Sequence, residues 1–250
     1  MKNTNNSIKA RHLLAILLLA CLPQFSVAKN QKNGINSNEC IILVHGLART
    51  SHSFSKMAVE LKNEGYNVVN LEYPSRKHPI EKLSKPYLSK AIDKCHSKNI
   101  SKIHFVSHSM GGILIRQYLS QHPINKLGNI VMLSPPNQGS EIVDKLGSFP
   151  GFFAINGPAG LQLETNENSL PNKLGAVDYP LGIITGNKSI NLILSMLIPG
   201  EDDGKVSVKR AKVAGMKDFL VVPHSHPFIM NSDIVISQVK YFLRFSTFKR

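Results

Sequence analysis

The stretch that decides the fold is KIHFVSHSMGGILIRQYLSQH, residues 102–122. Its first part, 102–107, is an apolar run of strand length, and 111–122 carries apolar residues at helical spacing. Between them, SHSMGG (107–112) has a small residue two positions before and two positions after Ser109. A serine on a tight, strained turn from strand to helix needs small residues at these positions. The pattern therefore predicts a nucleophile, Ser109, at the carboxyl end of a strand. An accidental Ser-Gly turn is the alternative, and the flanking strand and helix argue against it.

The same alternation of strand and helix extends along the chain on both sides of this stretch. CIILVHG (40–46) is a continuous apolar run, typical of a parallel strand buried on both faces. Further strands are predicted over 66–75, 129–136, 179–187 and 219–223. Helices are predicted over 51–65, 80–99 and 232–245. Alternating strands and helices indicate an α/β fold with a doubly wound, mostly parallel sheet and right-handed crossovers.

Two late segments interrupt this alternation. Residues 146–176 contain several prolines, glycines and phenylalanines, and we expect them to leave the sheet as a small cap or lid. The run from Ile190 to Ile198 is apolar but follows a predicted strand. Together the two segments can line an acyl pocket or form a lid. Packing of core and cap is the equally open alternative.

The first residues have the pattern of a secretory leader. Residues 1–28 combine basic residues, an apolar run and a small-residue cleavage region, which predicts a signal peptide and export to the periplasm or the medium. The apolar run, 13–22, is short for a membrane span. Lipid anchoring through Cys21 is a second processing route. Residues 29–39 are polar and predict a flexible lead-in, and 40–250 predict one catalytic domain.

Cleavage after residue 28 leaves two cysteines, Cys40 and Cys95. An even count in an oxidising compartment suggests a disulfide. Cys40 opens the first predicted strand and Cys95 lies near the end of a predicted helix, so both belong at the amino-terminal end of the sheet. The sequence therefore predicts a structural disulfide on the side opposite Ser109.

The chain is strongly basic. Its formal charge is +14, and removing the three basic residues of the leader leaves +11. Such a charge can bring a protein into peripheral contact with an anionic membrane surface, or with nucleic acid. The basic residues are scattered and no nucleic-acid motif accompanies them, so nucleic acid is not an expected partner. No His and Cys spacing of the metal type and no Gly-rich phosphate loop occurs, so neither metal nor cofactor is expected.

With these motifs in view, the chain resembles the bacterial lipase and esterase branch of the α/β-hydrolase superfamily. The resemblance rests on 107–112 together with VHGL (44–47) and extends over most of 40–245. It implies the α/β-hydrolase fold, with the backbone N–H groups of Leu47 and Met110 as the oxyanion hole. The family pattern usually has Gly where this chain has Ser107, which predicts a slightly more crowded turn. His45 is interpreted as structural.

A serine nucleophile needs a histidine as base and an acid to orient that histidine, and in this fold the chain order is Ser, acid, His. Two late segments offer these groups, PGEDDGKVS (199–207) and VVPHSHPFIM (221–230). By resemblance to the Asp-Gly-x-Val turn of lipases, Asp203 is the acid and Asp202 its solvated neighbour. His226 is the expected base. His224 is the competitor, but it directly follows the last strand, and His226 lies further into the loop.

These residues predict a hydrolase that cleaves small-molecule or lipid esters through a covalent acyl-enzyme. Ser109 attacks the ester, His226 carries the proton, Asp203 orients the base, and water completes the cycle. An acyltransferase, thioesterase or amidase on the same triad is an alternative. A non-catalytic binding protein that retains the fold is an alternative of another class.

Overall fold

The computed structural model describes residues 38–96 and 99–250. The predicted signal peptide (1–28), Cys21 and nearly all of the predicted lead-in (29–39) therefore lie outside the described residues. Within the described ranges, no helix has the length and apolar character needed to cross a membrane.

The core is a single six-stranded sheet in the order β2-β1-β3-β4-β5-β6. Every strand pair in it is parallel, so the expected mostly parallel sheet is parallel throughout the described residues. The six predicted strands are all present: β1 (Glu39–Val44), β2 (Asn67–Leu71), β3 (Lys102–His108), β4 (Leu127–Leu133), β5 (Leu181–Gly186) and β6 (Asp218–Val222). The first strand begins one residue earlier than the sequence suggested.

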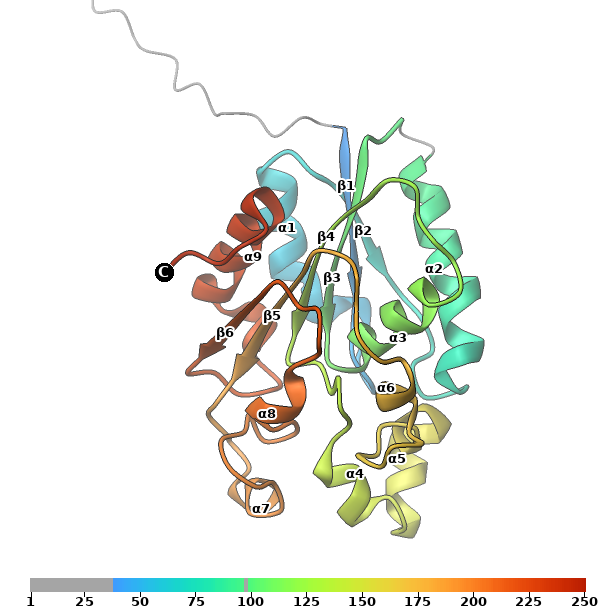
Figure 1. Cartoon of the computed structure of the whole chain (residues 1–250), viewed down its shortest axis with the longest axis vertical. Coiled ribbons are helices and arrows are strands. Elements are labelled where there is room, and N and C mark those ends of the chain that lie inside the picture. The colour runs from blue at the N-terminus through green and yellow to red at the C-terminus, as the bar shows by residue number, and fades with distance from the viewer. Residues whose placement is uncertain (1–37, 97–98) are drawn as a thin grey trace, which may run out of the picture. The chain divides into compact units, whose positions relative to one another are not determined.

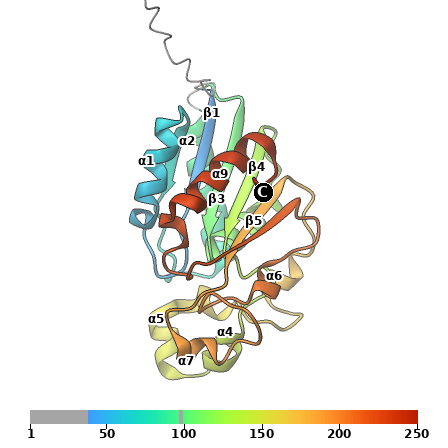
Figure 2. The same ribbon diagram turned by 90° about the vertical axis from the view of Figure 1, so that its left-hand side faces the viewer.

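Helices cover both faces of the sheet (Figures 1 and 2). One face packs against α1 (Ser55–Asn63) and α9 (Asp233–Phe245), and the other against α2 (Ile80–His96) and α3 (Met110–Leu119). Alternate residues of β1 supply the two layers: Ile42 belongs to the core under α2 and α3, and Ile41 to the core under α1 and α9. This double burial explains why β1 is continuously apolar.

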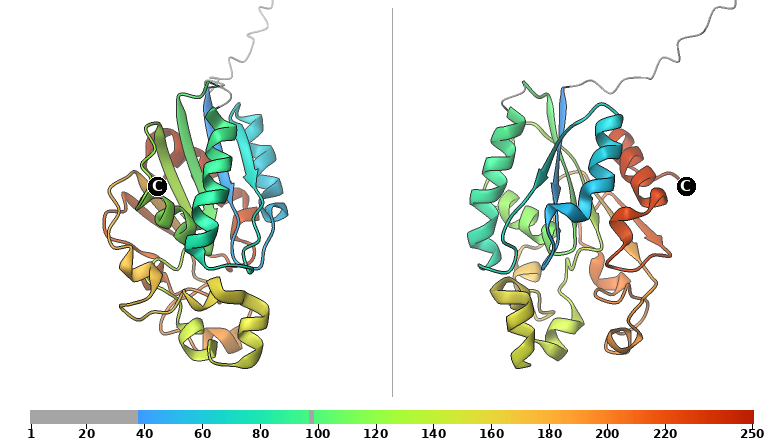
Figure 3. Two further views of the ribbon diagram at one scale, coloured as in Figure 1. Left: turned by 90° about the vertical axis from the view of Figure 1, so that its right-hand side faces the viewer. Right: turned by 180° about the vertical axis from the view of Figure 1, so that it is seen from behind.

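Shorter helices lie beyond the carboxyl ends of the strands, as the two views of Figure 3 also show. They are α4 (Glu141–Leu146), α5 (Pro150–Leu161), α6 (Leu170–Lys173), α7 (Leu192–Ser195) and α8 (Val208–Ala211). The segment 146–176, expected to leave the sheet, contains α5 and α6. A left-handed Gly157, with φ of 64°, kinks α5 just before Pro158. Two 3₁₀ turns, η1 (Ser51–Phe54) and η2 (Ile229–Asn231), precede α1 and α9.

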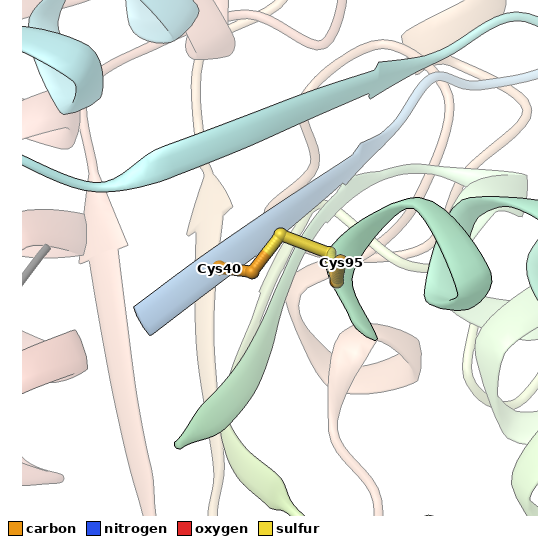
Figure 4. The surroundings of a disulfide bond; sticks show 2 residues. All are labelled: Cys40 and Cys95. Carbon is orange, nitrogen blue, oxygen red and sulfur yellow. A yellow bond between two sulfur atoms is a disulfide. The ribbon is translucent and has the colours of Figure 1, made fainter. Parts of the chain in front are cut away.

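A disulfide joins Cys40 of β1 to Cys95 of α2, as the sequence predicted (Figure 4). The two Cα atoms are 5.8 Å apart, and both side chains are fully buried. Cys40 is the second residue of its strand, so the bond lies at the amino-terminal end of the sheet, away from the end that carries Ser109.

The strand order indicates a ligand site at the carboxyl ends of β1 and β3. From β1 the chain continues to α1 on one face, and from the neighbouring strand β3 it continues to α3 on the other face. In open α/β sheets, a ligand site forms at the carboxyl ends of the strands where the connections diverge in this way. The loops after β1 and β3 hold Leu47 and Ser109.

Candidate active site

Ser109 occupies the turn between β3 and α3. Its backbone has φ of 53° and ψ of −128°, a region that a residue with a side chain rarely adopts. The neighbouring strand holds the turn, because the Ser109 N–H donates to the carbonyl oxygen of Leu133 at 2.8 Å. The carbonyl of Ser109 in turn accepts from the Gly112 N–H at 2.9 Å. This is the strained strand-to-helix turn that the sequence motif predicted.

Small residues around the turn allow the close approach of β1. A Cβ atom on Gly111 would collide with the carbonyl oxygens of Val44 and His45. A Cβ on Gly46 would lie 2.9 Å from Nδ1 of His108, closer than such atoms pack. Ser107, where the family pattern usually has Gly, is fully buried in β3.

His226 and Asp203 form a hydrogen-bonded pair. His226 Nδ1 lies 2.8 Å from Oδ2 of Asp203, and the His226 N–H donates to the Asp203 carbonyl oxygen at 2.9 Å. The other carboxylate oxygen accepts from the N–H groups of Val206 at 2.9 Å and Lys205 at 3.1 Å. Because a carboxylate accepts, Nδ1 carries the proton, and Nε2 is left to accept one.

The two competitors have other partners. His224 Nε2 lies 2.8 Å from the hydroxyl of Ser232, which caps α9. Asp202 was expected to be solvated, and this is wrong: only 7% of the residue is exposed. The reason is that α7 folds back, so that Ser195 donates to Asp202 Oδ2 while the Gly204 N–H donates to Oδ1 at 2.6 Å.

Ser109 and His226 line one cavity of about 100 Å³ at the carboxyl ends of the strands. Its apolar walls include Leu47 and Phe152, the latter from α5. The segment 190–198 does not line this cavity, contrary to one interpretation of the sequence. Four of its apolar side chains, Ile190, Leu192, Ile193 and Met196, are exposed, and no residue of α7 is buried.

The expected oxyanion donors have suitable positions. Met110 is the first residue of α3, and the first N–H groups of a helix have no acceptor within it. The amino-terminal end of a helix also carries partial positive charge, which favours an anion. Leu47 lines the cavity with Ser109. That these two N–H groups form an oxyanion hole stays a prediction.

His108 is a site residue whose role the sequence did not reveal. Its Nε2 lies 3.0 Å from the carbonyl oxygen of His226, so the nitrogen must be the donor. Burial lowers the pKa of His108 well below its ordinary value, and the nearby charges of His226 and Arg49 act in the same direction. His108 is therefore neutral, and it holds the backbone of the loop that carries His226. The two residues are 118 positions apart, so no local pattern could indicate the contact.

Lys205 is the second residue of this kind. It follows Asp203 by two positions and lines the cavity with Ser109 and His226. Burial lowers the pKa of its amine, and the charge of Asp203 opposes that shift. The lysine belongs to the turn sequence PGEDDGKVS (199–207), but no local pattern there indicates that it lines a cavity.

Other histidines have structural contacts. His45 Nδ1 lies 2.9 Å from the carbonyl oxygen of Gly46, and its ring stacks on Tyr73 at a centroid distance of 4.2 Å. His104 is buried in β3 beside Glu39. Within residues 38–96 and 99–250, no three His, Cys, Asp or Glu side chains are grouped to hold a metal ion.

Solved structures resemble this chain in fold. The mature lipase BlEst2 of Bacillus licheniformis aligns with a TM-score of 0.66 and 20% identity, over 86% of this chain and 94% of the lipase. The metagenomic carboxyl esterase MGS0156 aligns with a TM-score of 0.60 and 18% identity, over 78% of this chain and 67% of the esterase. An extracellular alpha/beta-hydrolase from a Paenibacillus species aligns with a TM-score of 0.51 and 16% identity, over 82% of this chain and 98% of that protein.

Sequence comparison gives the family. No curated protein matches the chain at a significant level. The family model described as the alpha/beta hydrolase fold matches residues 39–171, which is more than half of the chain and includes both the loop after β1 and the turn at Ser109. The protein belongs to the alpha/beta hydrolase fold family.

Proposed function

We propose that the protein hydrolyses carboxylic esters through an acyl-enzyme on Ser109. The observation that carries this proposal is the shared cavity: Ser109, on its strained turn, and His226, paired with Asp203, line the same space. A hydroxyl becomes a useful nucleophile only when a nearby base takes its proton. Here the free nitrogen of the base belongs to a residue that faces the nucleophile's cavity.

The mechanism has two steps, acylation of Ser109 and hydrolysis of the acyl-enzyme. Ser109 Oγ attacks the ester carbonyl carbon while its proton moves to Nε2 of His226, and the N–H groups of Leu47 and Met110 hold the resulting oxyanion. The tetrahedral intermediate then collapses, and the departing alcohol takes the proton from His226. Water attacks the acyl-enzyme with His226 again as base, which releases the carboxylic acid and restores the serine. Asp203 stabilises the imidazolium throughout.

The apolar walls of the cavity favour a substrate with an acyl chain, because Leu47, Phe152 and Val206 can pack against it. Both small soluble esters and lipid esters fit this description. The structural likeness to a lipase and a carboxyl esterase agrees with this choice. An acyltransferase, thioesterase or amidase would use the same residues and differ only in the acceptor or the bond cleaved.

A fluorophosphonate probe tests the proposal, because only an activated serine reacts with it. We expect the protein to be labelled and to hydrolyse nitrophenyl acetate, and both properties to fall to background in Ser109→Ala and in His226→Ala. Ser120→Ala, at the end of α3, is the matched control and keeps both. An unlabelled, inactive but folded protein would instead support a non-catalytic binding protein.

We also propose that the protein is exported with residues 1–28 as its signal peptide. The buried disulfide supports this proposal, since such bonds form and persist in oxidising compartments. Amino-terminal sequencing of the protein from its native cell tests it, and a first residue of Lys29 is expected. A lipid-modified Cys21 at the amino terminus would replace the proposed cleavage with lipoprotein processing.

A further inference from the structure

Exposed apolar side chains gather on two segments near the candidate site. Six of them, which we call the apolar rim, are 53–85% exposed: Phe149, Phe153, Ile155, Leu192, Ile193 and Met196. The first three lie on or beside α5, and the last three lie on or beside α7. Large apolar side chains that are exposed together mark an interaction surface more often than chance packing does.

The apolar rim lies at the end of the fold that holds the cavity. Figures 1 and 2 show α5 and α7 beyond the carboxyl ends of the strands. Ser109 directly follows β3 and shares its cavity with His226, so the cavity lies at the same end. Phe152 on α5 lines the cavity, whereas the next residue, Phe153, is exposed. One helix therefore separates the cavity from the surface.

Positive charge borders the α5 part of the apolar rim. Residues 146–163 and 186–200 contain no Asp or Glu. A second cavity, of about 700 Å³, is lined jointly by Phe153 and Ala154 of α5 and by three cations, Arg49, Arg76 and Lys77, against one acid, Glu72.

These cations are close to the apolar side chains. Arg76 Nη1 donates to the carbonyl oxygen of Ile155 at 3.4 Å, so this cation is adjacent to the apolar rim itself. Arg76 and Lys77 are both exposed and available to a partner. The one acid in the second cavity, Glu72, already accepts from the Ser51 N–H at 2.7 Å.

We propose that the apolar rim and the neighbouring cations dock the protein peripherally on an anionic lipid bilayer. Apolar side chains on short helices enter the boundary between headgroups and acyl chains, and exposed arginine and lysine contact lipid phosphates. The charge of +11 on residues 29–250 adds a longer-range attraction to the same surface. The proposal goes beyond ester hydrolysis and does not rest on it, because binding is measured without turnover.

Vesicle sedimentation of the exported protein tests the apolar part. We expect binding to vesicles of phosphatidylcholine with phosphatidylglycerol, and weak binding to phosphatidylcholine alone. Leu192→Asp and Met196→Asp should each reduce the partition coefficient about tenfold or more, because a charge replaces an inserted apolar group. Val59→Asp is the matched control. Val59 is 56% exposed on α1, outside the apolar rim, and this variant should bind as the unaltered protein does.

A second comparison tests the charged part. Lys77→Glu should weaken binding to the phosphatidylglycerol vesicles, and added salt should weaken binding of the unaltered protein. Lys62→Glu, an exposed position on α1, makes the same change in net charge and should have the smaller effect. Equal losses in both variants would show that net charge acts without a docking surface, and would overturn the proposal.

The remaining outcomes also decide the question. Absence of binding to phosphatidylglycerol vesicles overturns the proposal. So does a dimer in sedimentation equilibrium that dissociates on Leu192→Asp, because the apolar rim then faces a second copy. Hydrolysis of soluble nitrophenyl acetate should be unchanged in the variants of Leu192, Met196 and Lys77, so a failure of the ester hydrolase proposal and a failure of docking remain distinguishable.

Discussion

Asp202 and Asp203 are sequence neighbours with separate tasks. Asp203 accepts from the ring of His226, whereas Asp202 joins Ser195 of α7 to the turn. We therefore expect Asp203→Asn to lower kcat for nitrophenyl esters by about 10⁴, because the base loses its oriented tautomer, and to leave more activity than Ser109→Ala does.

The matched variants of the neighbouring residues should separate these tasks. Asp202→Asn should retain most of kcat and lower the unfolding temperature, since it perturbs hydrogen bonds to Ser195 and Gly204. His224→Ala should also be mild in kcat, because its ring contacts Ser232. A crippled Asp202→Asn enzyme beside an active Asp203→Asn enzyme would move the acid by one position.

The residues of the site differed in how far the sequence could predict their surroundings. The turn at Ser109 can be predicted from the sequence because its signature is local: a strand, small residues and a helix follow one another within one short stretch. The burial of Asp202 and the contact between His108 and His226 cannot be predicted in this way. Each depends on a contact with another segment of the chain. The spacing of residues within one stretch does not predict such tertiary contacts.

At the scale of elements, α5 sets the size of the cavity beside Ser109. The cavity is small, with a volume of about 100 Å³. We expect kcat/KM to be higher for nitrophenyl esters of short or medium acyl chains than for long ones. Phe152→Ala, which removes part of the wall, should shift the preference toward longer chains.

Phe153→Ala is the matched control for acyl length, because its side chain is exposed. With soluble esters it should leave the preference unchanged. A sharp rise in rate as an emulsified long-chain substrate passes its solubility limit would contradict the expected preference.

The disulfide links β1 to α2 at the end of the sheet opposite Ser109. It closes a separation of 55 residues, and we expect Cys40→Ala/Cys95→Ala to lower the free energy of unfolding by about 2–4 kcal/mol. Urea unfolding measures this loss. Ester kinetics should change little, since neither residue lines the cavity. Two titratable thiols in the unreduced, denatured protein of residues 29–250 would contradict the bond.

The sheet was predictable because a buried parallel strand is a continuous apolar run, as β1 and β5 illustrate. The region beyond the sheet was harder to predict. The apolar run 190–198 is compatible with an acyl pocket, a lid or core packing, yet Ile190, Leu192, Ile193 and Met196 are exposed. Apolar composition does not distinguish a surface that binds a partner from one that packs in the core.

For the whole molecule, two histidines are buried in neutral form at the carboxyl ends of β1 and β3. Burial lowers the pKa of His45, opposed by its contacts with Gly46 and Glu72. Burial also lowers the pKa of His108, reinforced by the charges of His226 and Arg49. In the unfolded chain each histidine takes up a proton as the pH falls through about 6.5, whereas in the folded protein its lowered pKa moves that uptake to a lower pH.

Stability should therefore be greatest above about pH 6.5 and fall below it, by up to about 1.4 kcal/mol per pH unit for each buried histidine. Urea unfolding at about pH 7.5 and about pH 5.5 measures the difference, in a window above the titration of ordinary carboxylates. His108→Asn should reduce the pH dependence, because it removes the group whose protonation favours unfolding. His52→Asn, at an exposed position, should leave the dependence unchanged. Two results would contradict this prediction: equal unfolding free energies at the two pH values, or an unaltered pH dependence in His108→Asn. Either would mean that His108 takes up its proton in the folded protein, so that its hydrogen bond to His226 is not that of a neutral imidazole.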